Sequence, residues 1–234
     1  MNDNKKQDNN KPGATGISSE TVYDGFFTLD RHVIEVDRYD GGKMLVERLV
    51  LKRGDSVAIL AYDPRLDQVL MIEQFSTGAF AAGDAPFGLC LPAGSLNKDE
   101  NIIAAAQREL KEETALDAKA LYVIHPGAYP SAGSCSERKA LVLAIVDMRK
   151  AGGVHGNPGE KESCKSVLMD AAGFIAQAER GQLQDMSAIV AALHLARSRL
   201  QLRKAFNKAA NCNKAQAAIL LRIKMHVKKT AASL

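Results

Sequence analysis

Hydrophobic residues follow two spacings along this chain, and the first is the alternation of apolar and polar positions that is typical of β-strands. The triplet Asp40-Gly41-Gly42 follows the first long alternating segment and predicts a hairpin. Asp63-Pro64-Arg65 predicts a second turn, between two apolar strands. The predicted strands cover residues 21–38, 44–52, 56–62, 68–74, 88–91, 120–124, 140–146 and 167–169.

The second spacing is helical, with apolar residues recurring every three to four positions. Asn97 precedes Glu100 by three residues, which predicts the N-cap and capping box of a helix that starts there. Two further helices are predicted over residues 170–181 and 186–202. On the first helix, the side chains expected to face a core are Ile102, Ile103, Ala106 and Leu110.

The order of these elements predicts the fold class and the domain organisation. Helices and strands alternate around one sheet, which favours an α/β protein built as an α/β/α sandwich with a mixed sheet. An antiparallel strand region is expected to precede it. The predicted parts are a disordered polar lead (1–19), an N-terminal strand region (20–54), a globular domain (55–202) and a basic C-terminal extension (203–234).

Charge is divided unevenly along the 234 residues. The formal net charge is +4, but ten of the 31 Lys and Arg residues and none of the 27 Asp and Glu residues lie from Arg197 onward, which leaves the rest of the chain at −6. A basic extension can contact nucleic acid, a membrane or an acidic partner, or it can be a solvated helix, which we favour. It lacks interleaved aromatic residues, so nucleic-acid binding is disfavoured.

The remaining composition points to a cytoplasmic protein with no membrane segment. No stretch approaches the roughly 18 consecutive apolar residues of a transmembrane helix. The first residues lack the apolar core of a secretory signal. Four cysteines are scattered without metal-type spacing, and we expect them to be reduced thiols (Cys90, Cys135, Cys164 and Cys212).

Three carboxylates give the chain its candidate chemistry. Glu109, Glu112 and Glu113 occupy positions i, i+3 and i+4 of the predicted helix and therefore share one face. Like charges at this spacing repel, so the cluster costs an isolated helix stability. A divalent cation reverses the sign of that cost, because Mg²⁺ prefers hard oxygen ligands and shares them with substrate phosphates. Arg108 precedes Glu112 by four residues and can orient its carboxylate.

The acidic helix lies within a longer pattern that resembles the Nudix box, G-x5-E-x7-R-E-U-x-E-E-x-G-U, in which U is aliphatic. Ala115 stands where the pattern has its second glycine. That departure matters if the backbone there needs a positive φ, which alanine resists. The matching residues are Gly94, Glu100, Arg108, Glu109, Leu110, Glu112, Glu113 and Leu116.

Outside the box, the chain from about Tyr23 to Leu202 resembles the ADP-ribose pyrophosphatase branch of the Nudix hydrolases. The resemblance implies Nudix-type α/β/α architecture and hydrolysis of ADP-ribose to AMP and ribose 5-phosphate with Mg²⁺, or Mn²⁺ in its place. It also implies a homodimer that exchanges its N-terminal strand region. The segments that carry it are GFFTLD (25–30), RG (53–54), MIEQF (71–75), LPAG (91–94), SER (136–138), HG (155–156) and EKE (160–162).

The same resemblance implies roles for individual residues. Glu160 is expected to activate water, and Glu112 lies beside the metal ligands as a second catalytic residue. One departure is Ser76, where the family usually has an arginine that can pair with phosphate or ribose oxygens. The implied metal ligands are Glu109, Glu113, Glu162 and the carbonyl of Ala93. The implied substrate contacts are Phe26 and Phe27 on the adenine, Arg48 across the ring, and Arg53, Ser95, Pro130 and Glu137.

Other functions stay open on the sequence alone. The substrate could be another nucleoside diphosphate sugar such as GDP-mannose, because the purine pocket cannot be resolved from residue types. A non-catalytic nucleotide-sensing domain would have lost box acids, whereas all of them are present. A decapping or nucleic-acid-binding protein is favoured only by the basic extension.

Overall fold

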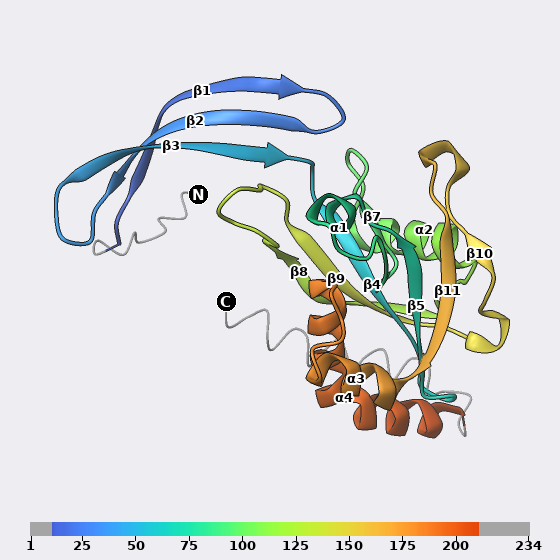
Figure 1. Ribbon diagram of the computed structural model, residues 1–234. Coiled ribbons are helices and arrows are strands. Elements are labelled where there is room, and N and C mark those ends of the chain that lie inside the picture. The colour runs from blue at the N-terminus through green and yellow to red at the C-terminus, as the bar shows by residue number, and fades with distance from the viewer. Residues whose placement is uncertain (1–10, 211–234) are drawn as a thin grey trace. The chain divides into compact units, whose positions relative to one another are not determined.

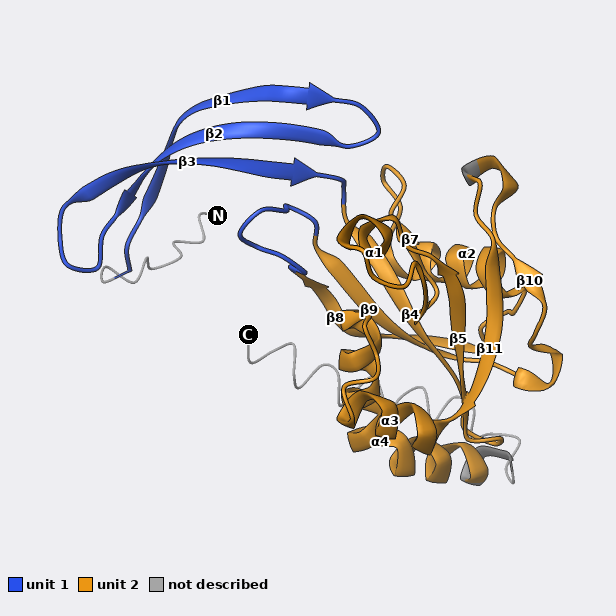
Figure 2. Ribbon diagram, viewed as in Figure 1, with its two compact units in different colours: residues 1–54, 129–137 blue, residues 55–128, 138–234 orange. Residues whose placement is uncertain are grey.

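The computed structural model describes residues 11–210 and contains two β-sheets (Figure 1). The chain divides into two compact units (Figure 2). Unit 1 comprises residues 1–54 and 129–137, and unit 2 comprises residues 55–128 and 138–234. Residues 129–137 thus belong to unit 1, although the sequence analysis assigned them to the globular domain.

Unit 1 is built on an antiparallel sheet of three strands, β1 (Ala14–Asp24), β2 (Thr28–Asp37) and β3 (Lys43–Lys52), in that order. The predicted hairpin turn between β2 and β3 is confirmed, and Gly41 and Gly42 adopt the positive φ angles that it requires. β1 includes residues that we expected to belong to the disordered lead, so that expectation is wrong from Ala14 onward.

Unit 2 contains a mixed sheet of eight strands. The strands run β10-β11-β5-β4-β9-β8, with β6 beside β5 and β7 beside β4, and β4 and β9 form the parallel pair. Every segment expected to be a strand in this unit contains one, while β7 and β10 were not predicted. The strands are β4 (Ser56–Asp63), β5 (Gln68–Phe75), β6 (Phe87–Cys90), β7 (Ala93–Ser95), β8 (Ala120–Ala128), β9 (Lys139–Ile145), β10 (Val154–His155) and β11 (Cys164–Asp170).

The helices of unit 2 are α1 (Thr77–Ala82), α2 (Ile102–Thr114), α3 (Ala171–Glu179) and α4 (Met186–Ala210), with 3₁₀ turns at Met148–Lys150 and Pro158–Glu160. α2 packs on one face of the sheet, and α3 and α4 pack on the other (Figure 1). β4 shows why: Val57 and Ile59 face α2, while Leu60 and Tyr62 face α3 and α4. The predicted α/β/α sandwich with a mixed sheet is confirmed.

The start of α2 differs from the prediction. Asn101, not Asn97, is the N-cap, and its side-chain oxygen accepts the N–H of Ala104 at 2.9 Å. Asn97 and Glu100 instead close a turn before the helix, since the Asn97 N–H donates to the Glu100 carboxylate at 2.9 Å. Ile103 lies on the exposed side of α2, so its predicted place in the core is wrong.

The last helix of unit 2 is longer than predicted. α4 continues to Ala210, past the predicted end at residue 202, and the basic segment after it lies outside the described residues. Between residues 11 and 210, no helix combines the length and the apolar character needed to cross a bilayer. The described cysteines, Cys90, Cys135 and Cys164, are free thiols, as predicted.

Candidate active site

The Gly94 loop, residues 92–95, includes β7 and brings the backbone of Gly94 against the carboxylate of Glu109 on α2. A Cβ atom at position 94 would lie 1.9 Å from Glu109 Oε1, so a side chain there would force this carboxylate to move. Glycine at this position therefore keeps Glu109 in its place by permitting a close approach of the backbone to the helix. Glu109 is 7% exposed, and burial raises its pKa, against the opposing effect of Arg108.

Glu113 lies one helical turn further along α2 and is almost completely buried, with 1% of its surface exposed. Its Oε2 accepts the backbone N–H of Ala93 at 2.8 Å. Burial is the largest cause of its raised pKa, which reaches about 8, and the charges of Glu109 and Glu162 act in the same direction. An ionised carboxylate in such a place is stable only with a positive partner.

Arg108 forms hydrogen bonds with residues before α2 and on α2. Its guanidinium donates to Glu100 at 2.9 Å, to Glu109 at 2.7 Å and to the carbonyl of Ser95 at 2.9 Å. Its distance to Glu112 is 3.5 Å, so the predicted ion pair with Glu112 forms but is the longest of its carboxylate contacts. Arg108 therefore links the loop before α2 to the helix itself.

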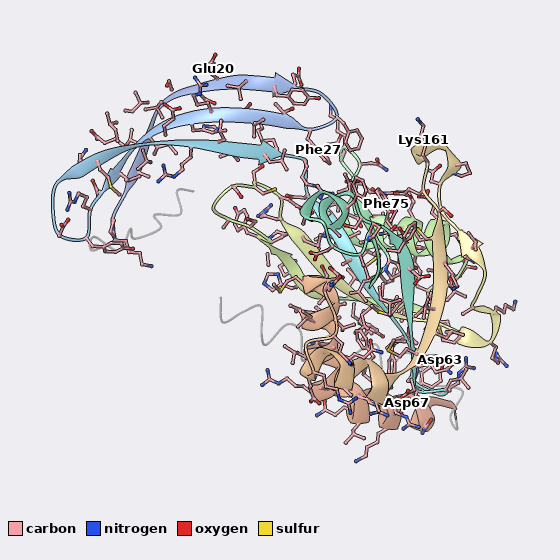
Figure 3. The ribbon with its side chains drawn as sticks, in the orientation of Figure 1. Glu20, Phe27, Asp63, Asp67, Phe75 and Lys161 are labelled. Atoms are coloured by element: carbon pink, nitrogen blue, oxygen red, sulfur yellow. The ribbon has the colours of Figure 1, made fainter. Side chains whose placement is uncertain are left out.

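A second loop approaches the same carboxylates from between β10 and β11, and Figure 3 shows Lys161 at its tip. The N–H of Gly156 donates to the carbonyl of Glu112 at 3.2 Å, which fastens the loop to α2. Gly156 has φ of 125°, and a Cβ there would lie 2.7 Å from the carbonyl oxygen of Glu162. Glu162 is close enough to raise the pKa of both Glu109 and Glu113. Glu160 ends the 3₁₀ turn of this loop.

These groups form a donor set of hard oxygen atoms that suits a divalent cation. Glu109 and Glu113 are buried, and the charge of Glu162 near them raises the pKa of both carboxylates, so a bound cation would relieve this repulsion. Among the described side chains, no group of three or more His, Cys, Asp or Glu residues encloses a metal ion by itself. Mg²⁺ does not need such a cage, because it commonly keeps water ligands and binds one or two carboxylates together with substrate phosphates.

The predicted substrate contacts in unit 1 divide into two groups. Phe27, Arg53 and Glu137 come together: the Arg53 guanidinium lies 5.2 Å from the centre of the Phe27 ring, and its Nε lies 3.7 Å from the Glu137 carboxylate. Phe26 packs beside Phe27, with ring centres 4.6 Å apart, and is 93% exposed. The sheet thus presents an open aromatic pair backed by an arginine.

Arg48 does not join this group within one chain. The register pairs Arg48 with His32, while Thr28 pairs with Lys52, so Arg48 lies several residues along β3 from the two phenylalanines. At about 3.3 Å per residue, that separation exceeds the reach of an arginine that stacks across the same ring. The cation beside Phe27 is Arg53, and the expected stacking of Arg48 is not formed by these residues of a single chain.

The structure also gives the positions of Ser95, Pro130 and Ser76. Ser95 is exposed at the end of β7, and Pro130 is exposed in the loop of unit 1. Ser76 caps α1, and its hydroxyl accepts the N–H of Ala79 at 3.3 Å. Phe75, just before it, ends β5 at the opposite end from Asp67, the residue that precedes the strand (Figure 3).

Sequence reasoning missed two residues that touch this site. Cys164 Sγ lies 3.6 Å from Glu113 Oε1 and donates to Gln74 Oε1 at 3.1 Å. Burial raises the pKa of the Cys164 thiol to about 12. Gln74 lies in the MIEQF segment, but its contact with a strand 90 residues away is a property of the sheet register, which local sequence does not reveal.

The chain matches the model of a known protein family over the residues that form this site. The family model described as the NUDIX domain matches residues 52–186, which include the Gly94 loop, α2 and the loop that carries Glu160 and Glu162. The chain belongs to the NUDIX family. It is a Nudix hydrolase, and α2 with the Gly94 loop is its Nudix box.

Curated relatives of this Nudix hydrolase are pyrophosphatases. ADP-ribose pyrophosphatase of Escherichia coli (strain K12) is 30% identical over 177 residues, which cover 75% of this chain and 84% of that protein. ADP-ribose pyrophosphatase of Haemophilus influenzae is 35% identical over 153 residues, covering 64% of this chain and 70% of that protein. The predicted resemblance to the ADP-ribose pyrophosphatase branch is confirmed.

The chain is also similar to a GDP-mannose pyrophosphatase and to a solved hydrolase structure. GDP-mannose pyrophosphatase of Cronobacter sakazakii is 25% identical over 185 residues, covering 76% of this chain and 93% of that protein. A solved structure titled "Crystal structure of ADP compounds hydrolase" superposes with a TM-score of 0.61 at 21% identity, covering 81% of this chain and 96% of that one. At that identity the superposition shows a shared fold.

Proposed function

We propose that this Nudix hydrolase cleaves the pyrophosphate bond of a nucleoside diphosphate sugar, with ADP-ribose as the substrate and AMP and ribose 5-phosphate as the products. Relatives named ADP-ribose pyrophosphatase, at 30% and 35% identity, support this choice of substrate. The geometric observation that carries it is the burial of Glu109 and Glu113 against the backbone of the Gly94 loop. Buried carboxylates of this kind can bind a divalent cation that also binds the phosphates of a diphosphate substrate.

Each group has a role in the proposed reaction. Glu109, Glu113, Glu162 and the carbonyl of Ala93 would hold Mg²⁺, or Mn²⁺ in its place. The bound cation would neutralise the diphosphate and stabilise the charge that develops on the bridging oxygen. Glu160 takes a proton from the attacking water, and Glu112 supports the cluster from the same helical face.

The remaining proposed contacts hold the two ends of the substrate. Phe26 and Phe27 offer an apolar surface to the adenine, and Arg53 with Glu137 lies beside Phe27. Ser95, next to the box, and Pro130 are assigned to the distal ribose. Arg48 remains a proposed contact, although it lies away from the two phenylalanines within one chain.

A substrate panel tests the proposal. The purified protein is incubated with Mg²⁺ and ADP-ribose, GDP-mannose, ADP-glucose or a dinucleotide, and the products are separated by ion-exchange chromatography. We expect the highest kcat/KM for ADP-ribose, with AMP and ribose 5-phosphate released in equal amounts. Hydrolysis that is absent for every compound, or unaffected by a chelator, would contradict the proposed reaction.

GDP-mannose is the second candidate substrate. It is favoured by the match to GDP-mannose pyrophosphatase over 93% of that relative. A higher kcat/KM for GDP-mannose in the same panel would replace ADP-ribose as the assignment.

We also propose a homodimer in which the N-terminal strand region, residues 20–54, is exchanged between subunits. Unit 1 leaves large apolar side chains of its sheet uncovered, including Tyr23 at 62%, Leu45 at 68% and Leu49 at 50% exposure. A three-stranded sheet needs an apolar face packed against something to be stable. A second copy of the chain supplies that partner in this proposal.

A further inference from the structure

Glu113 is approached on its buried side by a small polar network that spans three strands. Cys164 Sγ donates to Gln74 Oε1 at 3.1 Å and lies 3.6 Å from Glu113 Oε1. The amide nitrogen of Gln74 in turn donates to Cys90 Sγ at 3.3 Å. None of these partners of Glu113 belongs to the Nudix box.

The sheet register explains how these residues meet. β5 pairs with β11 on one side and with β6 on the other, so Cys164 lies beside Gln74, and Cys90 lies opposite Ile72. Side chains two residues apart on a strand share a face, which puts Gln74 and both sulfur atoms on the face that α2 covers. The amide of Gln74 is therefore fixed at both of its ends by thiols.

The two oxygen atoms of Glu113 are held with different strength. Oε2 accepts a backbone N–H from Ala93 at 2.8 Å, whereas among the described residues Oε1 is approached by the Cys164 thiol at 3.6 Å, whose single S–H is shared with Gln74 Oε1. A thiol is a weak hydrogen-bond donor. A strong donor would compete with a cation for the lone pairs of Oε1, and an apolar neighbour would leave that oxygen without a fixed position.

We propose that Cys164, itself held by Gln74, is a positioning residue that keeps Glu113 Oε1 directed toward the cation site without competing for it. This inference rests on the proposed function, because it assumes that Glu113 binds the divalent cation. It predicts that the thiol acts on metal affinity and has little effect on the chemical step.

Four substitutions separate the hydrogen bond from packing. Cys164→Val keeps an apolar side chain of similar size and removes the donor, while Cys164→Ser puts a stronger hydroxyl donor in the same place. Ser166→Ala is the matched control, because Ser166 lies two residues along β11 on the same face and its buried hydroxyl has no hydrogen-bond partner among the described residues. Gln74→Met removes the acceptor that holds the thiol and serves as a second variant if Cys164→Val fails to fold.

The first measurement is the binding of Mn²⁺ to the substrate-free proteins. The electron paramagnetic resonance signal of the free ion reports how much Mn²⁺ remains unbound. We expect Cys164→Val and Gln74→Met to weaken Mn²⁺ binding about fivefold, the factor that corresponds to one weak hydrogen bond. Cys164→Ser is also expected to bind Mn²⁺ more weakly than the wild type, because its hydroxyl competes with the cation for Oε1, and Ser166→Ala is expected to bind as the wild type does.

The kinetic measurement is the dependence of hydrolysis on Mg²⁺ concentration. In Cys164→Val the Mg²⁺ concentration for half-maximal rate should rise by the same factor of about five, while the substrate KM at saturating Mg²⁺ stays close to that of the wild type. A merely structural role would lower the melting temperature without changing this concentration.

Two results would overturn the inference. One is wild-type Mn²⁺ affinity in both Cys164→Val and Gln74→Met, and the other is an equal loss of affinity in Ser166→Ala. A wild-type protein that binds Mn²⁺ but hydrolyses no compound of the substrate panel refutes the proposed function alone, because the ratio of affinities between the variants still decides the role of Cys164.

Discussion

Glu113 is a buried acidic side chain whose burial opposes its ionisation. It is buried on α2, its pKa is raised to about 8, and its two nearest protein donors are a backbone N–H and a thiol. A group in this state binds a proton or a cation far better than it tolerates being an isolated charge. Its behaviour with and without metal is therefore the most direct test of the site.

Replacing Glu113 by glutamine should reduce kcat with ADP-ribose by about 100-fold or more, because a neutral amide is a poor ligand for Mg²⁺. Circular dichroism should show an unchanged fold, since glutamine has nearly the same shape. Glu179→Gln, on the exposed face of α3, is the control and should retain full activity. A normal kcat in Glu113→Gln would remove this residue from the metal site.

The stability of the metal-free protein should fall as the pH rises through 8. The pKa of Glu113 is near 8 in the folded state and near 4.5 in an unfolded chain, so the folded state binds the extra proton between these values. Its contribution is fully present below pH 4.5 and is lost as the pH passes 8. Urea unfolding at pH 6 and pH 9 in a chelator should show this decline in the wild type and much less of it in Glu113→Gln.

Glu160→Gln is expected to lower kcat and to leave Mn²⁺ binding unchanged, because a general base acts on water and does not hold the cation in this scheme. Steady-state kinetics and metal titration of the same preparation measure the two effects. Glu162→Gln is the contrasting variant, in which metal affinity should fall. A normal kcat in Glu160→Gln would assign the base to another residue of the loop.

At the scale of elements, α2 shows both the reach and the limits of sequence reasoning. Its existence, its buried Ala106 and Leu110 and its acidic face follow from local spacing. Its first residue does not, because Asn97 and Asn101 are both good N-cap residues, and only the folded chain shows that Asn101 caps the helix while Asn97 closes a turn with Glu100. The helix α1 also escaped prediction, since six residues give too short a period to detect.

Ala115 supplies a prediction for the end of α2. It adopts φ of 58° and ψ of 11°, the left-handed conformation in which the box pattern has glycine. Ala115→Gly should therefore stabilise the protein by about 0.5–1 kcal/mol, because glycine adopts this conformation without steric cost. The same substitution at exposed Ala104, within the helix, should destabilise it. Urea unfolding of both variants provides the measurement, and a loss of stability in Ala115→Gly would contradict this account.

At the scale of the whole molecule, the proposed dimer is tested by removing the apolar character of unit 1. The wild type should have twice the 25.2 kDa mass of one chain by light scattering after size-exclusion chromatography. Leu45→Glu with Leu49→Glu places two charges on the exposed face of β3 and should give monomers with unchanged secondary structure. Glu47→Gln, between them, is the control and should remain dimeric. A monomeric wild type would refute the exchange.

The sequence by itself determined the features that depend on neighbouring residues. These are the strand and helix periods, the hairpin at residues 40–42 and the spacing of the box acids. The spacing of apolar and charged residues along the chain is a local property, so it can be read without a structure. They were enough to predict the sandwich and the family.

Tertiary structure alone decided which distant residues meet. The pairing of β5 with β11 brings Cys164 to Glu113, and the pairing of β2 with β3 gives Phe27 an arginine at position 53 instead of position 48. Strand register depends on contacts between segments that are far apart in the chain, and a shift of one residue would turn each side chain to the other face. No local pattern carries that information, which is why the surroundings of Glu113 emerged only from the folded chain.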